Sequence, residues 1–387
     1  MSRLIWASFP AAPISADMFS RSALLCLLLG AVTLLACTPR GSFQLSPQTD
    51  PAASVLPVFV GTNRPLSDGN AVSVGRADSL SFQHYDISIP ANRETGRIQW
   101  PKGSADPARH FVTLDAGTYR DSTAFVSAIR RALASKPPNE RDVVVFVPGY
   151  NTTLAEGVYR LAQMDHDLGM EAVPIYFAWP TAEQMLGYVH DRDSALYSRF
   201  DLLRFLQLID QAGANQVLVM AHSMGGLLTL EVMRQAELNR PGSVPDLIDG
   251  LVMISPDIDA DLALQELSEI SALPVPFIVF TNNDDRALRL ASRLGGDNPR
   301  LGRGAEVAEF SDIPIIFLDV TAFSEDASGD FGHLTLGSSP ALIELVPQLR
   351  DIAEALDYNP AAAPGLLPGT VLSVREASEV VLSPAGP

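Results

Sequence analysis

The chain has 387 residues, of which 47% are hydrophobic, so it can form a sizeable buried core and is not a disordered protein. Its 45 acidic and 27 basic residues give a net charge of −18, which opposes binding to nucleic acid phosphates and anionic lipid surfaces. Nucleic acid is therefore excluded as an expected partner. We expect no cofactor and no metal, because no Cys/His cluster suits a metal ion and no glycine-rich loop has the spacing of a dinucleotide site.

The N-terminal segment has the features of a bacterial secretion signal. Arg21 precedes an apolar stretch over residues 23–36, whose 14 residues are too few for a transmembrane helix, which needs about 20. The end of this stretch, Leu34-Leu35-Ala36-Cys37, resembles the bacterial lipobox, in which the cysteine is lipidated and becomes the first residue after cleavage. An ordinary signal peptide cleaved nearby is the alternative. The sequence leaves open whether translation begins at Met1 or Met18.

These features predict an order of segments along the chain. Residues 1–36 are expected to be a signal peptide of the lipoprotein type, and residues 37–54, polar with prolines, a tether behind the lipid on Cys37. A folded domain is expected over residues 55–357, and residues 358–387 are expected to form a tail rich in proline and alanine. We therefore expect a protein of the bacterial cell envelope, held at the outer membrane by its lipid and facing the periplasm. This anchor is its only expected contact with the membrane.

Apolar runs alternate with amphipathic helical patterns from residue 143 onward, after three short extended stretches and one helical pattern. Apolar strands separated by helices are typical of a parallel sheet covered on both faces. We therefore expect an α/β fold with a doubly wound, mostly parallel sheet of about eight strands. The predicted strands are Val58–Gly61, Tyr85–Pro90, Phe111–Leu114, Val143–Val147, Val173–Ala178, Gln216–Ala221, Leu251–Ser255, Phe277–Thr281 and Ile313–Val320, with Val371–Val374 and Val380–Leu382 as possible edge strands. The predicted helices are Ala124–Ala134, Leu154–Leu168, Ser194–Gln211, Gly226–Leu238, Asp259–Ile270, Ala287–Leu294 and Ala341–Leu356.

Ser223 lies between a predicted strand and a predicted helix, where the parallel sheet would gather reactive groups. Ala221, Ser223 and Gly225 match the small-x-Ser-x-Gly pattern of a nucleophile elbow. In such a turn the serine backbone is strained and its hydroxyl projects, and small neighbours let strand and helix approach closely. Ser339 fits the same spacing, but Pro340 follows it, so it is better interpreted as a helix N-cap. We predict that Ser223 is a nucleophile, with a structural serine in a βα turn as the alternative.

A serine hydroxyl needs a base that takes its proton. In this architecture the partners follow in the order serine, acid, histidine, and His333 is the only one of six histidines downstream of Ser223. We therefore predict His333 as the base, with a solvated loop histidine as the alternative. His222 is expected to point away from Ser223 and to support the core, because successive residues of an extended chain face opposite ways.

Two loops could supply the acid that orients the base. Asp284 and Asp285 follow one predicted strand, and Asp257 and Asp259 follow the strand before it. The usual position follows the later strand, so Asp285 is favoured, with Asp284 and Asp257 as alternatives. Either pair could instead cap the helix that follows it, a common use of aspartate. The acid would stabilise the imidazolium without becoming protonated.

The oxyanion of an acyl-transfer reaction needs backbone donors that are already in place. One would be the amide of Met224, directly after the nucleophile. The other would be the amide of Tyr150, in the loop after Val143–Val147, where Gly149 allows the turn.

Together these features resemble the α/β-hydrolase superfamily, and more closely its bacterial branch named domain of unknown function 900. The resemblance covers residues 55–300 well and extends more thinly to 357. It implies that Ser223, Asp285 and His333 take the triad positions, and the branch name implies no natural substrate. One departure is Pro148, where the family usually has histidine, which stiffens the oxyanion loop. The resemblance rests on Phe59-Val60-Gly61-Thr62-Asn63-Arg64, SIPANRETGRIQWP from Ser88, VFVPGYN from Val145, FAWPT from Phe177, HSMGG from His222, SPDID from Ser255 and NDDRAL from Asn283.

The sequence thus predicts a serine esterase or lipase-like hydrolase that forms an acyl-enzyme on Ser223 and acts on a small-molecule or lipid ester. One alternative is an acyltransferase with the same triad, since the acceptor is chosen by the shape and dryness of the pocket. Another is an envelope lipoprotein that keeps the fold without catalysis. The acyl chain length and the oligomeric state stay open.

Overall fold

The computed structural model describes residues 41–67, 72–304, 307–325, 332–345, 370–376 and 379–384. The predicted signal peptide and the predicted lipidation site Cys37 lie outside the described residues, as do residues 346–356 of the last predicted helix. The strands are β1 Ser54–Thr62, β2 Ser81–Ile89, β3 Val112–Tyr119, β4 Val143–Val147, β5 Val173–Ala178, β6 Val217–His222, β7 Gly250–Ile254, β8 Phe277–Thr281, β9 Ile316–Asp319, β10 Thr370–Glu376 and β11 Glu379–Pro384. The helices are α2 Ser122–Ala134, α3 Leu154–Asp167, α4 Tyr188–Asp210, α5 Met224–Asn239, α6 Ala260–Ser268, α7 Arg286–Leu294 and α8 Thr335–Ser338.

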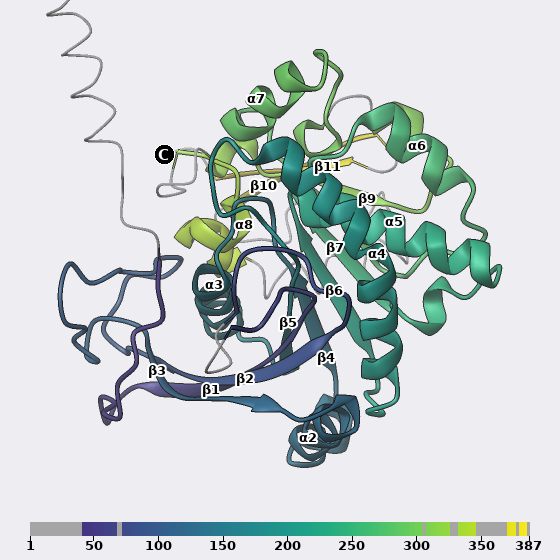
Figure 1. The fold of residues 1–387 in the computed structure, drawn as a ribbon. Helices are drawn as coiled ribbons and strands as arrows, with labels where there is room; N and C mark the ends of the chain where they lie inside the picture. Colours follow the sequence, from purple (N-terminus) through teal and green to yellow (C-terminus); the bar gives the residue numbers. More distant parts are fainter. Residues whose placement is uncertain are drawn as a thin grey trace, which may run out of the picture. The chain divides into compact units, whose positions relative to one another are not determined.

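One sheet runs through the described part of the chain, in the order β10-β11-β9-β8-β7-β6-β4-β5-β1-β2-β3 (Figure 1). The pairs from β1 through the centre to β11 are parallel, whereas β1 with β2, β2 with β3 and β10 with β11 are antiparallel. The prediction of a doubly wound, mostly parallel α/β fold is confirmed. The sheet has eleven strands in the described residues rather than about eight, because it includes both strands of the C-terminal tail and the N-terminal antiparallel strands.

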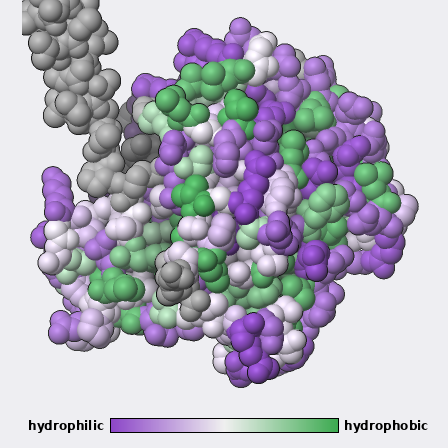
Figure 2. All heavy atoms as spheres, viewed as in Figure 1, coloured by the Kyte–Doolittle hydropathy of each residue, from purple (hydrophilic) through white to green (hydrophobic). Residues whose placement is uncertain are grey.

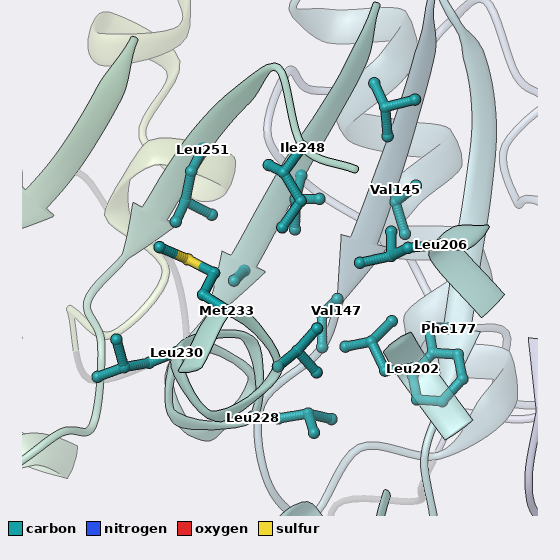
Figure 3. Packing of buried hydrophobic residues seen from close by; sticks show 14 of the residues in the cluster. Val145, Val147, Phe177, Leu202, Leu206, Leu228, Leu230, Met233, Ile248 and Leu251 are labelled. Carbon is teal, nitrogen blue, oxygen red and sulfur yellow. The ribbon is translucent and has the colours of Figure 1, made fainter. Parts of the chain in front are cut away.

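Both faces of the sheet are covered by helices, as the continuous apolar strands require. Alternate residues of β4 face opposite clusters: Val145 packs with residues of α2, α4, α5 and α6, and Val144 packs with residues of α3. Figure 1 shows α4, α5 and α6 on one side of the sheet and α3 with α8 on the other. Figure 3 shows Val145 and Val147 from β4, Leu202 and Leu206 from α4, and Leu228 and Met233 from α5 meeting in the first of these clusters.

The folded unit begins at Ser42, earlier than the predicted boundary at residue 55. Phe43 stacks on Tyr85 with ring centroids 4.5 Å apart, and the amide of Gln44 donates to the Tyr159 hydroxyl. The amide of Thr113 in turn donates to the Gln44 carbonyl. Phe43 and Gln44 of the predicted tether therefore contact the domain, whereas Leu45 is 76% exposed.

Several element boundaries differ from the predictions: β3 ends at Tyr119 rather than Leu114, and two helices begin earlier than expected. Helix α4 begins at Tyr188 rather than Ser194, and α5 begins at Met224 rather than Gly226. The first turn of α4 carries no side-chain cap, and the buried side chain of Asp191 holds it instead. Ser339 caps the helical residues 340–345 as predicted, with its hydroxyl accepting from the Leu342 amide.

Apolar and polar residues are interspersed on the face of the molecule seen in Figure 2. Among the described helices, none combines the length and apolar character that crossing a membrane would need.

Candidate active site

Ser223 occupies a sharp turn between β6 and α5. Its φ of 53° and ψ of −122° are unusual for a residue with a side chain, and such strain persists only where the surroundings enforce it. The Ser223 amide donates to the Ile254 carbonyl at 3.0 Å, and the Ser223 carbonyl accepts from the amides of Gly226 and Asp257. Backbone contacts to β7 and its following loop therefore fix the turn from outside.

The small residues around the turn are required by close backbone approaches. A Cβ atom on Gly225 would lie 2.4 Å from the Val147 carbonyl oxygen and 2.5 Å from that of Pro148. A Cβ atom on Gly149 would lie 2.9 Å from the Cβ of Ser223. The loop after β4 therefore lies directly against the turn that presents Ser223.

His333 and Asp285 are brought together from loops that follow different strands. His333 Nδ1 lies 2.7 Å from Asp285 Oδ2, and the carboxylate of Asp285 is fully buried. The other carboxylate oxygen accepts from the Leu288 amide and so caps α7. The Asn282 side chain donates to the carbonyl of Gly332, next to the histidine. The loop that carries His333 is thus held twice by residues that follow β8: Asn282 binds its backbone, and Asp285 binds the histidine side chain.

The two alternative acids lie elsewhere. Asp284 is exposed, and its amide donates to Asn282 Oδ1. Asp257 is buried, where Oδ2 accepts from the Tyr188 hydroxyl at 2.8 Å and Oδ1 lies 3.4 Å from Arg300 Nε. Asp259 caps α6, as the alternative interpretation expected. Of these four carboxylates, only that of Asp285 forms a hydrogen bond with the predicted base, His333.

His222 lies beside His333 rather than in the core, which corrects the expectation from strand alternation. The ring centroids are 4.7 Å apart, and His222 Nε2 lies 3.2 Å from the His333 carbonyl oxygen, to which it donates. Burial, and secondarily the neighbouring His333, hold the pKa of His222 well below its usual range, so the ring is neutral. The alternation argument assumed that the strand continues, but the positive φ at Ser223 ends it at His222.

The two predicted oxyanion donors lie in the segments expected for them. Met224 is the first residue of α5, and amides of a first turn have no carbonyl partner within their own helix. Tyr150 follows β4 in the loop that contacts Ser223. The Thr152 hydroxyl donates to the Gly149 carbonyl at 3.0 Å, and Trp179 Nε1 donates to the Pro148 carbonyl at 2.9 Å. This loop is therefore held by side chains from both sides.

Residues 121–350 match the model of a protein family described as alpha/beta hydrolase of unknown function (DUF900), which is more than half of the chain. The chain belongs to this alpha/beta hydrolase family. The match includes Ser223, Asp285 and His333. A search of curated proteins found none that matches this alpha/beta hydrolase.

The solved structures that the comparison returned include proteins described as hydrolases. A protein described as a hydrolase from Agrobacterium vitis S4 is 12% identical, covers 73% of this chain and 97% of its own, and has a TM-score of 0.34. A dienelactone hydrolase-like promiscuous phosphotriesterase, P91, from metagenomic libraries is 14% identical, covers 79% and 98%, and has a TM-score of 0.35. The propionate-bound esterase Est2 of Thermogutta terrifontis is 12% identical, covers 78% and 95%, and has a TM-score of 0.32.

Ser223 of this alpha/beta hydrolase is only 1% exposed. The ring of Tyr150, in the loop after β4, packs edge to face against the ring of Tyr188, at the start of α4. Their centroids are 5.6 Å apart. A groove of about 600 Å³ is present at the β2–β3 edge, but Ser223, Asp285 and His333 do not line it. Within the described residues, no group of three His, Cys, Asp or Glu side chains could hold a metal ion.

Proposed function

We propose that this protein is a serine hydrolase that cleaves carboxylic esters through an acyl-enzyme on Ser223. The observation that carries the proposal is the pairing of His333 with buried Asp285, at the edge of the sheet where the strained Ser223 turn lies. The acid, the base and the nucleophile follow three different strands, so their grouping at one edge is a property of the fold.

The hydrogen bond of His333 Nδ1 to Asp285 determines that the other ring nitrogen, Nε2, acts as a proton acceptor. In this hydrogen bond Nδ1 keeps its proton and donates to the carboxylate, so Nε2 can accept the proton of the Ser223 hydroxyl. Oγ then attacks the ester carbonyl carbon, and the tetrahedral oxyanion collapses as the C–O bond to the alcohol breaks. His333 returns its proton to the leaving alcohol. Water repeats the sequence on the acyl-enzyme and releases the acid.

The oxyanion would accept hydrogen bonds from the amides of Tyr150 and Met224. The close approach of Gly149 to Ser223 supports this assignment, because Tyr150 directly follows Gly149. Preorganised donors of this kind contribute about 100-fold to 1,000-fold each to the rate. His222 supports the base, since its ring donates to the backbone of His333.

We further propose that the enzyme is held at the envelope by lipid on Cys37, facing the periplasm. The support is the lipobox-like sequence that ends at Cys37. The substrate would be a small-molecule or lipid ester.

The test is hydrolysis of p-nitrophenyl esters from acetate to octanoate by the purified protein. We expect turnover of at least one ester, and we expect Ser223→Ala to remove it. Ser268→Ala is the matched control, because that serine is exposed at the end of α6 and should leave turnover unchanged. Turnover by Ser223→Ala at the wild-type rate would contradict the proposal, as would a folded wild type that neither hydrolyses esters nor transfers their acyl groups.

A further inference from the structure

Asp191 is a buried charged residue in the first turn of α4 that the proposed chemistry does not use. Its side chain is 0% exposed, although His190 beside it and Asp193 on the same helix are exposed. A buried carboxylate is tolerated only where donors surround it. The partners of Asp191 therefore show what the residue holds in place.

Three donors from three segments meet on this carboxylate. Oδ2 accepts from the Asn151 amide at 2.8 Å, and Oδ1 accepts from the Ala182 amide at 2.6 Å. His190 Nδ1 lies 3.1 Å from Oδ1, and the Asp191 amide donates to the Gly187 carbonyl. The carboxylate thus ties the loop after β4 and the loop after β5 to the start of α4.

The first of these loops contains the proposed oxyanion donor. Asn151 directly follows Tyr150 and has a φ of 56°, a conformation that needs support in a residue with a side chain. Its amide belongs to the peptide plane that follows Tyr150, so the bond to Asp191 fixes that plane.

The peptide plane before Tyr150, between Gly149 and Tyr150, is fixed through its carbonyl group. It contains the Gly149 carbonyl and the Tyr150 amide, which point in opposite directions in a trans peptide. Because the Thr152 hydroxyl holds the Gly149 carbonyl, it also sets the direction of the Tyr150 N–H. Two consecutive planes are therefore oriented: the first by Thr152, and the second by Asp191 together with a longer contact, at 3.3 Å, from the Thr152 hydroxyl to the Tyr150 carbonyl.

We infer that Asp191 is a positioning residue that, together with Thr152, orients the oxyanion-binding amide of Tyr150. The inference rests on the proposed ester hydrolysis. It explains why α4 begins earlier than its sequence pattern predicts, since the first turn exists to place this carboxylate between the two loops. Asp191 does not contact the substrate and acts only through the backbone.

The test compares Asp191→Asn with Asp193→Asn, which makes the same change of charge on the exposed face of the same helix. An asparagine side chain has one acceptor oxygen, so one of the two backbone amides loses its partner. We expect kcat to fall about 10-fold to 100-fold in Asp191→Asn, with KM changed less than about 3-fold. Asp193→Asn should keep the wild-type kcat.

Active sites are counted with a fluorophosphonate, and kcat is expressed per labelled site, so that loss of folded protein is not mistaken for loss of function. Thr152→Val, which removes the hydroxyl at nearly constant volume, should lower kcat per site in the same way. Wild-type kcat per site in both Asp191→Asn and Thr152→Val would overturn the inference while ester hydrolysis stands. A wild type without esterase activity would instead remove the proposed function, and the inference with it.

Discussion

Asp285 has two hydrogen-bonding roles that a single substitution can separate. One carboxylate oxygen caps α7 through the Leu288 amide, and the other accepts from His333. Asparagine is also a good N-cap, so Asp285→Asn should keep the cap and the fold. It replaces a charged acceptor with a neutral amide and so loses the stabilisation of the imidazolium. We expect kcat to fall about 1,000-fold to 10,000-fold, measured with the best p-nitrophenyl ester.

Asp284→Asn is the matched control for this prediction, because Asp284 is the adjacent carboxylate and is exposed. It should retain the wild-type kcat. If Asp284→Asn lost activity and Asp285→Asn kept it, the acid would have been assigned to the wrong residue.

The residue that sequence reasoning placed wrongly is His222. Its neighbour Ser223 could be predicted from local spacing, because small residues must flank such a turn. The direction of His222 could not, since it depends on a backbone reversal and on a loop that arrives 111 residues later. The one signal in the sequence was that a histidine, which a purely core position does not require, directly precedes the predicted nucleophile.

At the scale of the elements, the central strands were predictable within one or two residues. Each is a short apolar run buried on both faces, so its sequence carries the full signal. The start of α4 was not predictable, because Asp191 fixes it through partners on two distant loops. The packing of Phe43 on Tyr85 likewise depends on tertiary contact and leaves no periodic pattern in the sequence.

Helix α3 carries a buried acid that should make stability depend on pH. Burial raises the pKa of Asp165 to about 7, and its Oδ1 has no hydrogen-bond partner among the described residues. The folded state keeps this proton while the unfolded state releases it near the ordinary value of 3.8. Stability from this group is therefore lost as pH rises from about 4 to about 7, by at most about 4 kcal/mol.

Asp165→Asn removes this titration. We expect the variant to be more stable than the wild type at pH 8, and the gap in the free energy of unfolding to shrink toward pH 4. Urea unfolding at both pH values measures the gap, with Glu171→Gln, an exposed carboxylate, as the control. A gap that is the same at both pH values would contradict the assignment.

At the scale of the whole molecule, the sheet sets the site by bringing the ends of β4, β6, β8 and β9 to one edge. The sequence predicted the class of sheet, doubly wound and mostly parallel, but not the order of its strands, because an apolar run does not indicate which other strand it pairs with. The strands of the tail illustrate this limit: β11 pairs in parallel with β9, although they are separated by a long stretch of sequence.

The proposed anchor predicts where the whole molecule is found. Cys37→Ala should leave the folded domain intact, since the compact unit begins at Ser42, and should move the protein from the membrane fraction to the aqueous fraction. Detergent phase partition of cells producing either form measures this shift. Equal partition of both forms would contradict lipidation at Cys37.

The central claim is that Ser223 is a nucleophile activated by His333. The most direct measurement is labelling of the folded protein with a fluorophosphonate, followed by mass spectrometry of the modified peptide. The account predicts one adduct per chain, on Ser223, lost in Ser223→Ala and strongly slowed in His333→Ala. An adduct on another serine, or labelling of Ser223 that is as fast without His333 as with it, would contradict the account.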